Sequence, residues 1–256
     1  MISNYINDAF DRNIFKATKQ LNNKMKVILD KKPKSPIIIE GFPGFGLVGT
    51  IATEFLIRHL NAKEIGRIRV KEVPPVIAVH EGKAVEPLGI FYDSKHNIVI
   101  LHALTSVAGI EWEIADLVTE LAKELKAKEV ISIEGIHAEE EITSDGVFYI
   151  GSSKKLAASG AKQLKEGIIM GVSGALLVKR SINTSFIFAE AASTMPDSRA
   201  AAKIIEVLDR YLGLKVDPKP LLKKAEEFET KLRGLIDKAR LNKQDAGNKK
   251  QLTYLG

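Results

Sequence analysis

The sequence has no cysteine in 256 residues, which excludes disulfide bonds and thiolate metal sites. Aromatic residues make up only 6% of the chain. Nucleic-acid-binding surfaces combine clustered basic residues with aromatic side chains, so we expect no nucleic-acid partner. No apolar run approaches the roughly 20 residues of a membrane-spanning helix, and the N-terminus lacks the apolar segment of a signal peptide. These absences predict a cytoplasmic protein that has no membrane contact.

The composition is that of an ordinary globular chain. Hydrophobic residues account for 45% and charged residues for 27%, with a net charge of +6. Lysines and glutamates alternate along the sequence, as on a solvated surface rich in ion pairs. At this length the chain can bury a full core as one large domain, or as one domain with an appendage.

Alternating strand and helix patterns predict the fold class. Apolar runs predict strands at 36–41, 65–71, 76–80, 84–91, 97–103, 129–134, 147–150 and 184–190. Several runs are continuously apolar, which favours a sheet covered on both faces. Helical periodicity predicts helices over 110–126 and 197–212, and Asp197 suits the start of the second. We therefore predict a three-layer α/β/α sandwich with a mixed sheet.

The chain divides into segments of different character. A polar extension covers residues 1–24, the sandwich covers 25–217, a charged amphipathic helix covers 218–241, and a polar tail covers 242–256. The breaker-rich KKPKSP run precedes the first predicted strand of the sheet. We expect the extension to contribute little to folding.

A glycine-rich loop follows the strand at 36–41 and opens an amphipathic helix. It contains Gly41, Gly44, Gly46 and Gly49, and the last three form a G-x-G-x-x-G pattern. One hypothesis is that the loop binds a nucleotide, with the pyrophosphate at the helix N-terminus. The alternative is that the glycines allow close packing of helix on strand, with Phe42 and Phe45 in the core. We favour the structural role.

Catalytic and metal-binding patterns are weak. Ser173 lies in G-V-S-G-A, which lacks one glycine of a nucleophile elbow, and the segment equally suits the start of a packed helix. His137 is followed by Glu139, Glu140 and Glu141. That cluster could hold a divalent metal or form an exposed acidic loop, and we favour the loop. We therefore assign no catalytic residue, no metal and no cofactor.

Three blocks of sequence resemble the archaeal branch of the proteasome assembly chaperone 2 family. They are PIIIEGFPGFGLVG, EGIIMGVSGALL at 166–177, and the segment 195–229. The resemblance covers about residues 25–240. It implies a fold like that of the purine nucleoside phosphorylases without their catalytic residues. It also implies a homo-oligomer that binds the α-subunit ring of the 20S proteasome.

The resemblance also directs attention to the last residues. In family members that engage the ring, a C-terminal motif of hydrophobic residue, tyrosine and any residue enters pockets between α subunits. This chain ends in Leu252, Thr253, Tyr254, Leu255 and Gly256. The tyrosine is third from the end rather than penultimate, so the motif is displaced by one residue. We expect a docking tail here, the alternative being an unused terminus.

The segment 218–241 has an apolar seam. Leu221, Ala225, Phe228, Leu232 and Leu235 recur at steps of 4 and 3, close to a heptad pattern. We expect this seam to form part of an oligomer interface, although it could also pack on its own domain. With the family resemblance, which implies the proteasome partner, these features predict a non-enzymatic proteasome assembly factor or activator. The alternative is a nucleotide-binding enzyme or sensor that uses the Gly44–Gly49 loop.

Overall fold

The structure is a computed structural model of the chain. It describes residues 25–73, 77–80, 83–137, 146–191 and 194–216, together with residues 222, 223, 227 and 230. Within these ranges, no helix is both long enough and apolar enough to cross a membrane.

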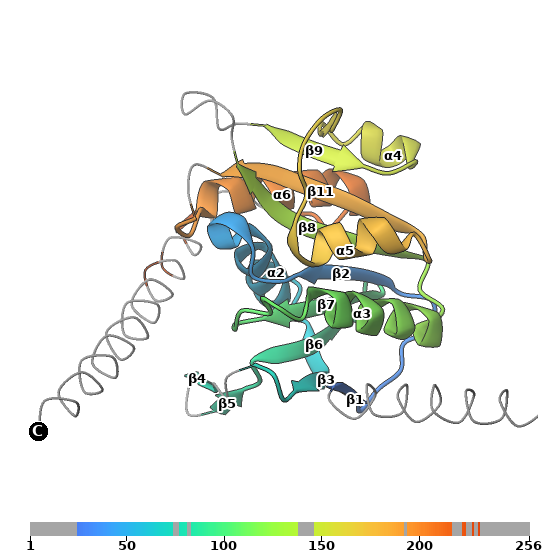
Figure 1. The fold of residues 1–256 in the computed structure, drawn as a ribbon, viewed down its shortest axis with the longest axis vertical. Helices are drawn as coiled ribbons and strands as arrows, with labels where there is room; N and C mark the ends of the chain where they lie inside the picture. Colours follow the sequence, from blue (N-terminus) through green and yellow to red (C-terminus); the bar gives the residue numbers. More distant parts are fainter. Residues whose placement is uncertain are drawn as a thin grey trace, which may run out of the picture.

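The described residues form a mixed sheet of nine strands in the order β1-β3-β6-β7-β2-β8-β11-β9-β10 (Figure 1). The central strands β7 (Ile98–Ala103), β2 (Ile37–Gly41), β8 (Glu129–His137) and β11 (Thr184–Ala191) run parallel to one another. On one side the antiparallel strands β6 (Leu88–Asp93), β3 (Lys63–Val70) and β1 (Met25–Leu29) extend the sheet. On the other side lie β9 (Val147–Ile150) and β10 (Lys162–Gln163).

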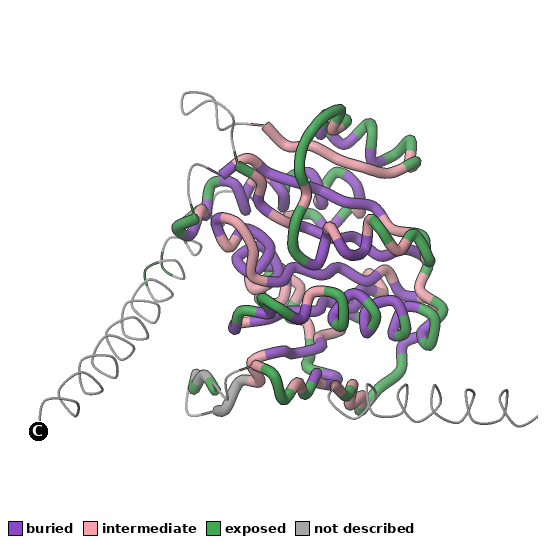
Figure 2. The backbone as a smooth tube through the Cα atoms, viewed as in Figure 1, coloured by how far each residue is buried: buried purple, intermediate pink, exposed green. Residues whose placement is uncertain are grey.

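Helices cover both faces of the sheet. The helices α3 (Glu111–Leu125) and α5 (Gly171–Lys179) pack with one apolar cluster, which contains Ile38, Val130 and Phe188. The helices α2 (Val48–His59) and α6 (Ser198–Leu212) pack with the other, which contains Ile39 and Ile133. A short helix, α4 (Lys154–Ala157), contacts α6. The central strands are correspondingly buried (Figure 2). The arrangement is a layered α/β structure, as predicted.

The central strands and long helices lie close to where the sequence predicts them. Asp197 caps α6, and its side chain accepts a hydrogen bond from the Ala200 N–H at 2.9 Å. This cap stabilises the free N–H groups of the first turn. The glycine- and small-residue segment around Ser173 forms α5, as the packed-helix interpretation expects.

Two details of the predicted strand set are wrong. The predicted strand 84–91 is two strands: β5 (Lys83–Val85) pairs with β4 (Ala78–His80) in a separate sheet, and β6 joins the main sheet after Pro87. Proline has no N–H for a sheet ladder, which explains the break. In addition, the predicted set omits both edge strands of the sheet: β1, which pairs antiparallel with β3, and the two-residue β10, which pairs with β9.

The core ends in an anchored segment after α6. Gly213 closes the helix in a left-handed conformation at φ 75°, and the following Leu214 is buried. Beyond it, residues 222, 223, 227 and 230 are helical. The other residues of the predicted helix 218–241, the extension 1–24 and the tail 242–256 lie outside the described residues.

Candidate functional site

The glycine-rich loop joins β2 to α2 through a short 3-10 helix, η1 (Phe45–Leu47). Gly46 has φ 62°, in the left-handed region that favours glycine. A Cβ on Gly46 would lie 2.8 Å from the Cβ of Ala191, and the Gly46 carbonyl accepts a hydrogen bond from the Asp197 N–H at 2.8 Å. The loop is therefore packed against the start of α6.

Two other glycines permit close backbone contacts. A Cβ on Gly41 would lie 2.3 Å from the Gly49 carbonyl oxygen, and one on Gly49 would lie 2.6 Å from the Ile133 carbonyl oxygen. Neither atom belongs to a flexible side chain, so a methyl group would require backbone movement. Because these two positions are glycine, the helix can pack closely on the strands. The first turn of α2 therefore lies directly against β2 and β8.

Gly44 faces a carboxyl group rather than backbone. A Cβ on Gly44 would lie 2.5 Å from Oε1 of Glu134, and one on Gly171 would lie 3.1 Å from the same atom. The Glu134 carboxyl therefore lies against both the glycine loop and the first residue of α5. A bound phosphate at Gly44 would meet this carboxyl group.

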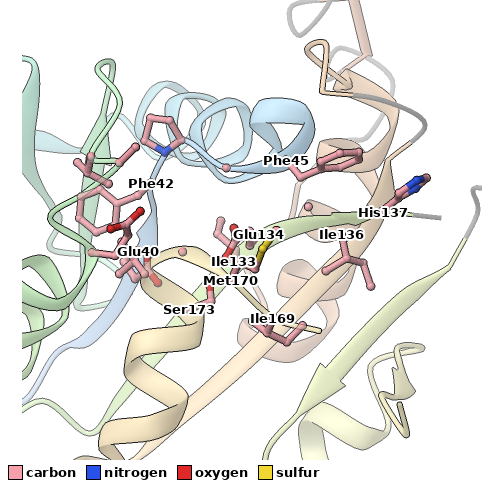
Figure 3. Close-up of a pocket in the computed structure, with 18 of the residues that line it drawn as sticks. Glu40, Phe42, Phe45, Ile133, Glu134, Ile136, His137, Ile169, Met170 and Ser173 are labelled. Carbon is pink, nitrogen blue, oxygen red and sulfur yellow. The ribbon is translucent and has the colours of Figure 1, made fainter. Parts of the chain in front are cut away.

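A cavity of about 440 Å³ opens beside this contact, at the carboxyl edge of the parallel strands. The neighbouring strands β2 and β7 are followed by α2 and α3, which lie on opposite faces of the sheet, and such switch points commonly form ligand sites in α/β folds. Figure 3 shows side chains from β2, the loop, β8 and α5 around the cavity. Its wall is mainly apolar, with Phe42, Pro43, Phe45, Val107, Ile133, Ile136, Ile168, Ile169, Met170 and Val172.

The strand register places two carboxyl groups together on the cavity wall. Glu40 on β2 pairs with Ser132 on β8. Side chains alternate along a strand, so Glu134, two residues after Ser132, projects from the same face. Both glutamates line the cavity, and this face is the one that α3 and α5 cover.

Burial controls the protonation of both groups. The pKa of Glu40 is raised to about 8, mainly by loss of hydration; a hydrogen bond from Ser132 opposes the rise, the nearby Glu134 carboxylate adds to it, and a backbone hydrogen bond from Phe42 opposes it. Loss of hydration likewise raises the pKa of Glu134 to about 7, and a hydrogen bond with Ser173 opposes it. Glu40 is 1% exposed, and its Oε1 has no hydrogen-bond partner among the described residues.

Ser173 belongs to this polar group and is not arranged as a nucleophile. Its Oγ lies 2.7 Å from the Oγ of Ser132, and it also bonds the Glu134 carboxyl. An activated serine requires an adjacent general base, usually histidine. Ser173 is instead a buried hydroxyl at the base of α5.

His137 lies at the end of β8 and also lines the cavity. Its ring stacks on Phe45 at a centroid distance of 5.5 Å. Glu139, Glu140 and Glu141 lie outside the described residues, so the hypothesis of a metal at this cluster stays untested. Elsewhere in the described part of the chain, no group of three or more histidine, aspartate and glutamate residues is close enough to hold a metal.

A second buried polar group lies on the opposite face, under α2. His102 Nδ1 is 2.8 Å from Thr53 Oγ1, and its Nε2 is 3.3 Å from Glu54 Oε2. The Nε2 atom makes no hydrogen bond with the described residues, so its contact with Glu54 is electrostatic only. Burial lowers the pKa of His102. This neutral histidine therefore has a packing and hydrogen-bonding role.

Sequence reasoning missed the two glutamates, although a signal for them exists. β2 contains Ile37-Ile38-Ile39-Glu40-Gly41 and β8 contains Ile131-Ser132-Ile133-Glu134-Gly135. An acidic residue inside an apolar strand, repeated before a glycine in two strands, indicates paired buried carboxyl groups. The predicted docking tail, Leu252–Gly256, and the seam residues Leu221, Ala225, Phe228, Leu232 and Leu235 lie outside the described residues.

The fold and the site define the class of protein: it is a mixed α/β protein with a nine-stranded sheet and a cavity beside the glycine loop, at the switch point of the sheet. The chain belongs to the PAC2 family, whose model matches residues 38–236.

Relatives of known structure agree with this assignment. The chain is 35% identical to Pyrococcus furiosus PbaA, described as an archaeal homolog of proteasome-assembly chaperone; the match covers 84% of this chain and 99% of that one, with a TM-score of 0.75. Pyrococcus furiosus PbaB, described as an archaeal proteasome activator, shares the fold at a TM-score of 0.67 and 22% identity, covering 83% and 98% of the two chains. An uncharacterized protein of Methanocaldococcus jannaschii is 29% identical over 210 residues, covering 80% of this chain and 87% of its own.

Proposed function

We propose that this chain is a non-enzymatic, homo-oligomeric factor that binds the α-subunit ring of the 20S proteasome and assists its assembly or activation. The observation that carries the proposal is the 35% identity to PbaA over 99% of that chain. Relatedness over a whole chain supports a shared kind of partner more strongly than fold likeness alone, because unrelated functions can share a fold.

The docking element in this proposal is the tail Leu252–Gly256. It follows the polar segment NKQDAGNKKQ, which suits a flexible linker. Tyr254 would enter a pocket between adjacent α subunits as a buried aromatic anchor. The terminal carboxylate would add a charged contact. Several tails on one oligomer would dock in several pockets, so weak single contacts gain affinity through effective concentration.

The oligomer in this proposal depends partly on the seam Leu221, Ala225, Phe228, Leu232 and Leu235. Pro218 and Pro220 separate this segment from the sandwich in sequence. An apolar seam at heptad-like spacing suits a helix that pairs with another helix. Pairing between copies would set the number and spacing of tails that can reach one ring.

A nucleotide on the Gly44–Gly49 loop is the alternative function, and the local contacts favour it less. Gly41, Gly46 and Gly49 each meet neighbouring atoms of the fold closely, which explains those glycines without a ligand. Gly44 faces the Glu134 carboxyl, a group that opposes a phosphate when it is ionised. We therefore propose that the loop has a structural role.

The test is binding of the purified full chain to immobilised α rings, measured by surface plasmon resonance. Deletion of residues 252–256 should abolish binding without changing the melting temperature or the oligomer mass. Tyr254→Ala should weaken binding by at least about tenfold, since anchor residues at interfaces contribute 2 kcal/mol or more. Tyr254→Phe, which keeps the ring, is the matched control and should retain most of the affinity.

Deletion of Gly256 alone tests the displaced motif. It places tyrosine in the penultimate position, so binding should be preserved or strengthened. Equal binding by the full chain and by the variant lacking residues 252–256 would contradict the tail hypothesis. Thermal stabilisation by ATP, GTP, NAD or NADP would instead support the nucleotide alternative, because a ligand at a hundred times its Kd adds about 2.7 kcal/mol.

A further inference from the structure

The cavity at the switch point contains a buried acceptor that the fold leaves unused. Glu40 lines the cavity, and its buried Oε1 has no hydrogen-bond partner among the described residues. A buried polar atom without a partner is destabilising by about 1–3 kcal/mol. Such an atom in a side chain that lines a cavity indicates a ligand that supplies the missing donor.

The neighbouring groups are also acceptors or hydroxyls. Glu134 lies across the same wall and raises the pKa of Glu40 through its charge. Ser132 and Ser173 lie between strand and helix at 2.7 Å from each other. Figure 3 shows Glu40 beside Phe42, and Glu134 and Ser173 near Met170 and Ile169. The polar end of the cavity is therefore negatively charged when the carboxyl groups of Glu40 and Glu134 are ionised. The rest of the cavity wall is apolar.

This arrangement disfavours anions and hard metal ions. An anion at the glycine loop would meet the Glu134 carboxyl, which already lies against Gly44 and Gly171. Calcium takes 6–8 oxygen ligands, and magnesium requires a near-octahedral set. Two carboxyl groups and two mutually bonded hydroxyls on an apolar wall do not provide either set. An organic cation needs fewer partners and gains from apolar contact.

We propose that this cavity binds a small primary ammonium ion carried on an apolar body, with the ammonium donating hydrogen bonds to Glu40 and Glu134. An ammonium group has three donors, which can satisfy the free oxygen of Glu40 and the facing oxygen of Glu134 together. The alkyl or ring body lies against Phe42, Ile136 and Met170. The volume of about 440 Å³ falls in the range of small-molecule sites.

The cavity has an accessible mouth formed by the segment before α5. Ile168 is 88% exposed and Met170 is 74% exposed, and both line the cavity. Exposed apolar side chains at an entrance can contact the apolar end of a ligand. The ammonium end then reaches the buried carboxyl groups at the inner wall.

Binding of a cation here is linked to protons. Burial holds the pKa of Glu40 at about 8 and that of Glu134 at about 7, so the empty site is largely protonated at pH 6. Glu111 and His137 are the other titratable groups on the cavity wall. An ammonium ion favours the ionised carboxylates, so each amine bound should release about one proton. Affinity should then rise about tenfold per pH unit between pH 6 and pH 7.

The experiment is isothermal titration calorimetry of the full chain with n-pentylamine, and with 1-pentanol as the uncharged analogue of equal length. We expect saturable binding of the amine and binding of the alcohol at least tenfold weaker, because an interaction with a buried charge is lost. Titrations at pH 7 in phosphate and in MOPS, which differ in ionisation heat and contain no primary amine, should report the released proton.

Variants assign the binding to the cavity. Glu40→Gln and Glu134→Gln should each weaken amine binding at least tenfold, while Glu113→Gln, on the exposed side of α3, should change it less than threefold. Melting curves confirm that each variant is folded. The proposal is overturned if the amine does not bind, if the alcohol binds equally well, or if both cavity variants bind like the wild type. Binding to α rings is a separate measurement, so its failure would not affect this outcome.

Discussion

Replacement of Glu40 by glutamine should stabilise the protein at neutral and alkaline pH and change it little at pH 5. Glu40 is 1% exposed, and burial raises its pKa to about 8 from an ordinary value of 4.5. The folded state therefore retains a proton on this carboxyl that the unfolded state loses. Glutamine has a similar shape and remains neutral at every pH.

The sign and size follow from proton linkage. A group with a raised carboxyl pKa contributes stability that is complete below the unfolded pKa and is lost as pH rises toward the folded pKa. The window here runs from about 4.5 to about 8. At 1.36 kcal/mol per pKa unit, the full loss is on the order of 5 kcal/mol. Between pH 5 and pH 7 the loss is roughly 2–3 kcal/mol.

The assay is urea unfolding of the wild type and of Glu40→Gln at pH 5, 6, 7 and 8, followed by circular dichroism. With slopes of about 1–3 kcal/mol/M, the midpoints should differ by about 1 M at pH 7 and converge at pH 5. Some dependence on pH should remain in the variant, because burial also raises the pKa of Glu134. Glu120→Gln, at an exposed position on α3, is the matched control.

One result would refute this reasoning. If the difference in midpoint between wild type and Glu40→Gln is the same at pH 5 and pH 8, the carboxyl does not titrate between these values in the folded protein. A difference equal to that of Glu120→Gln would lead to the same conclusion. In either case Glu40 would be hydrated, and the cavity would lack its buried acceptor.

Three further predictions concern packing and assembly. Gly49→Ala should destabilise the fold by about 1–3 kcal/mol, because its methyl group would meet backbone atoms. Gly109→Ala is the control: its methyl group would meet nothing within 4 Å, so it should cost only about 1 kcal/mol for its left-handed backbone. Equal losses of stability in urea unfolding would argue against the backbone contact at Gly49. Replacing Phe228 and Leu232 together by Glu should split the oligomer while the sandwich stays folded, because unpaired charges would enter the interface; unchanged mass in light scattering would place the seam on its own domain. Deleting residues 1–24 should move the melting temperature by only a few degrees, and loss of soluble yield would contradict this.

The central part of the fold could be predicted because its signals are strong and local. The runs Ile98–Leu101 and Phe186–Ala189 are continuously apolar, as strands buried on both faces must be. The helix α6 also has a strong local signal, because its apolar residues recur at helical spacing and Asp197 marks its first turn. Each of these elements carries its own periodicity, so no long-range information is needed.

The edge of the sheet was less predictable for a physical reason. β1 contains only Met25–Leu29, and one face of an edge strand contacts little of the core. Its pairing with β3 depends on residues about 40 positions away, which a short window cannot detect. Pro87 did carry a local signal, since it separates β5 from β6.

The candidate site could not be predicted, because it depends on the pairing register of β2 and β8, which the sequence alone does not give. Glu40 and Glu134 are 94 residues apart in the chain and meet because β2 and β8 are neighbours with Glu40 beside Ser132. The repeated pattern of Glu-Gly after an apolar run is visible in the sequence. Its meaning becomes clear only when the two strands are placed side by side.

The other end of β8 has a mechanical consequence. Glu129, its first residue, accepts hydrogen bonds from Ser185 on β11 and from Tyr211 on α6. Tyr211 is followed closely by the buried Leu214, where the described core ends. The two bonds therefore join the last turn of α6 to β8 and β11, which lie inside the sheet rather than at its edge. Loss of the Glu129 carboxyl would remove this buried partner from both hydroxyls and would loosen the point at which the described chain leaves the core.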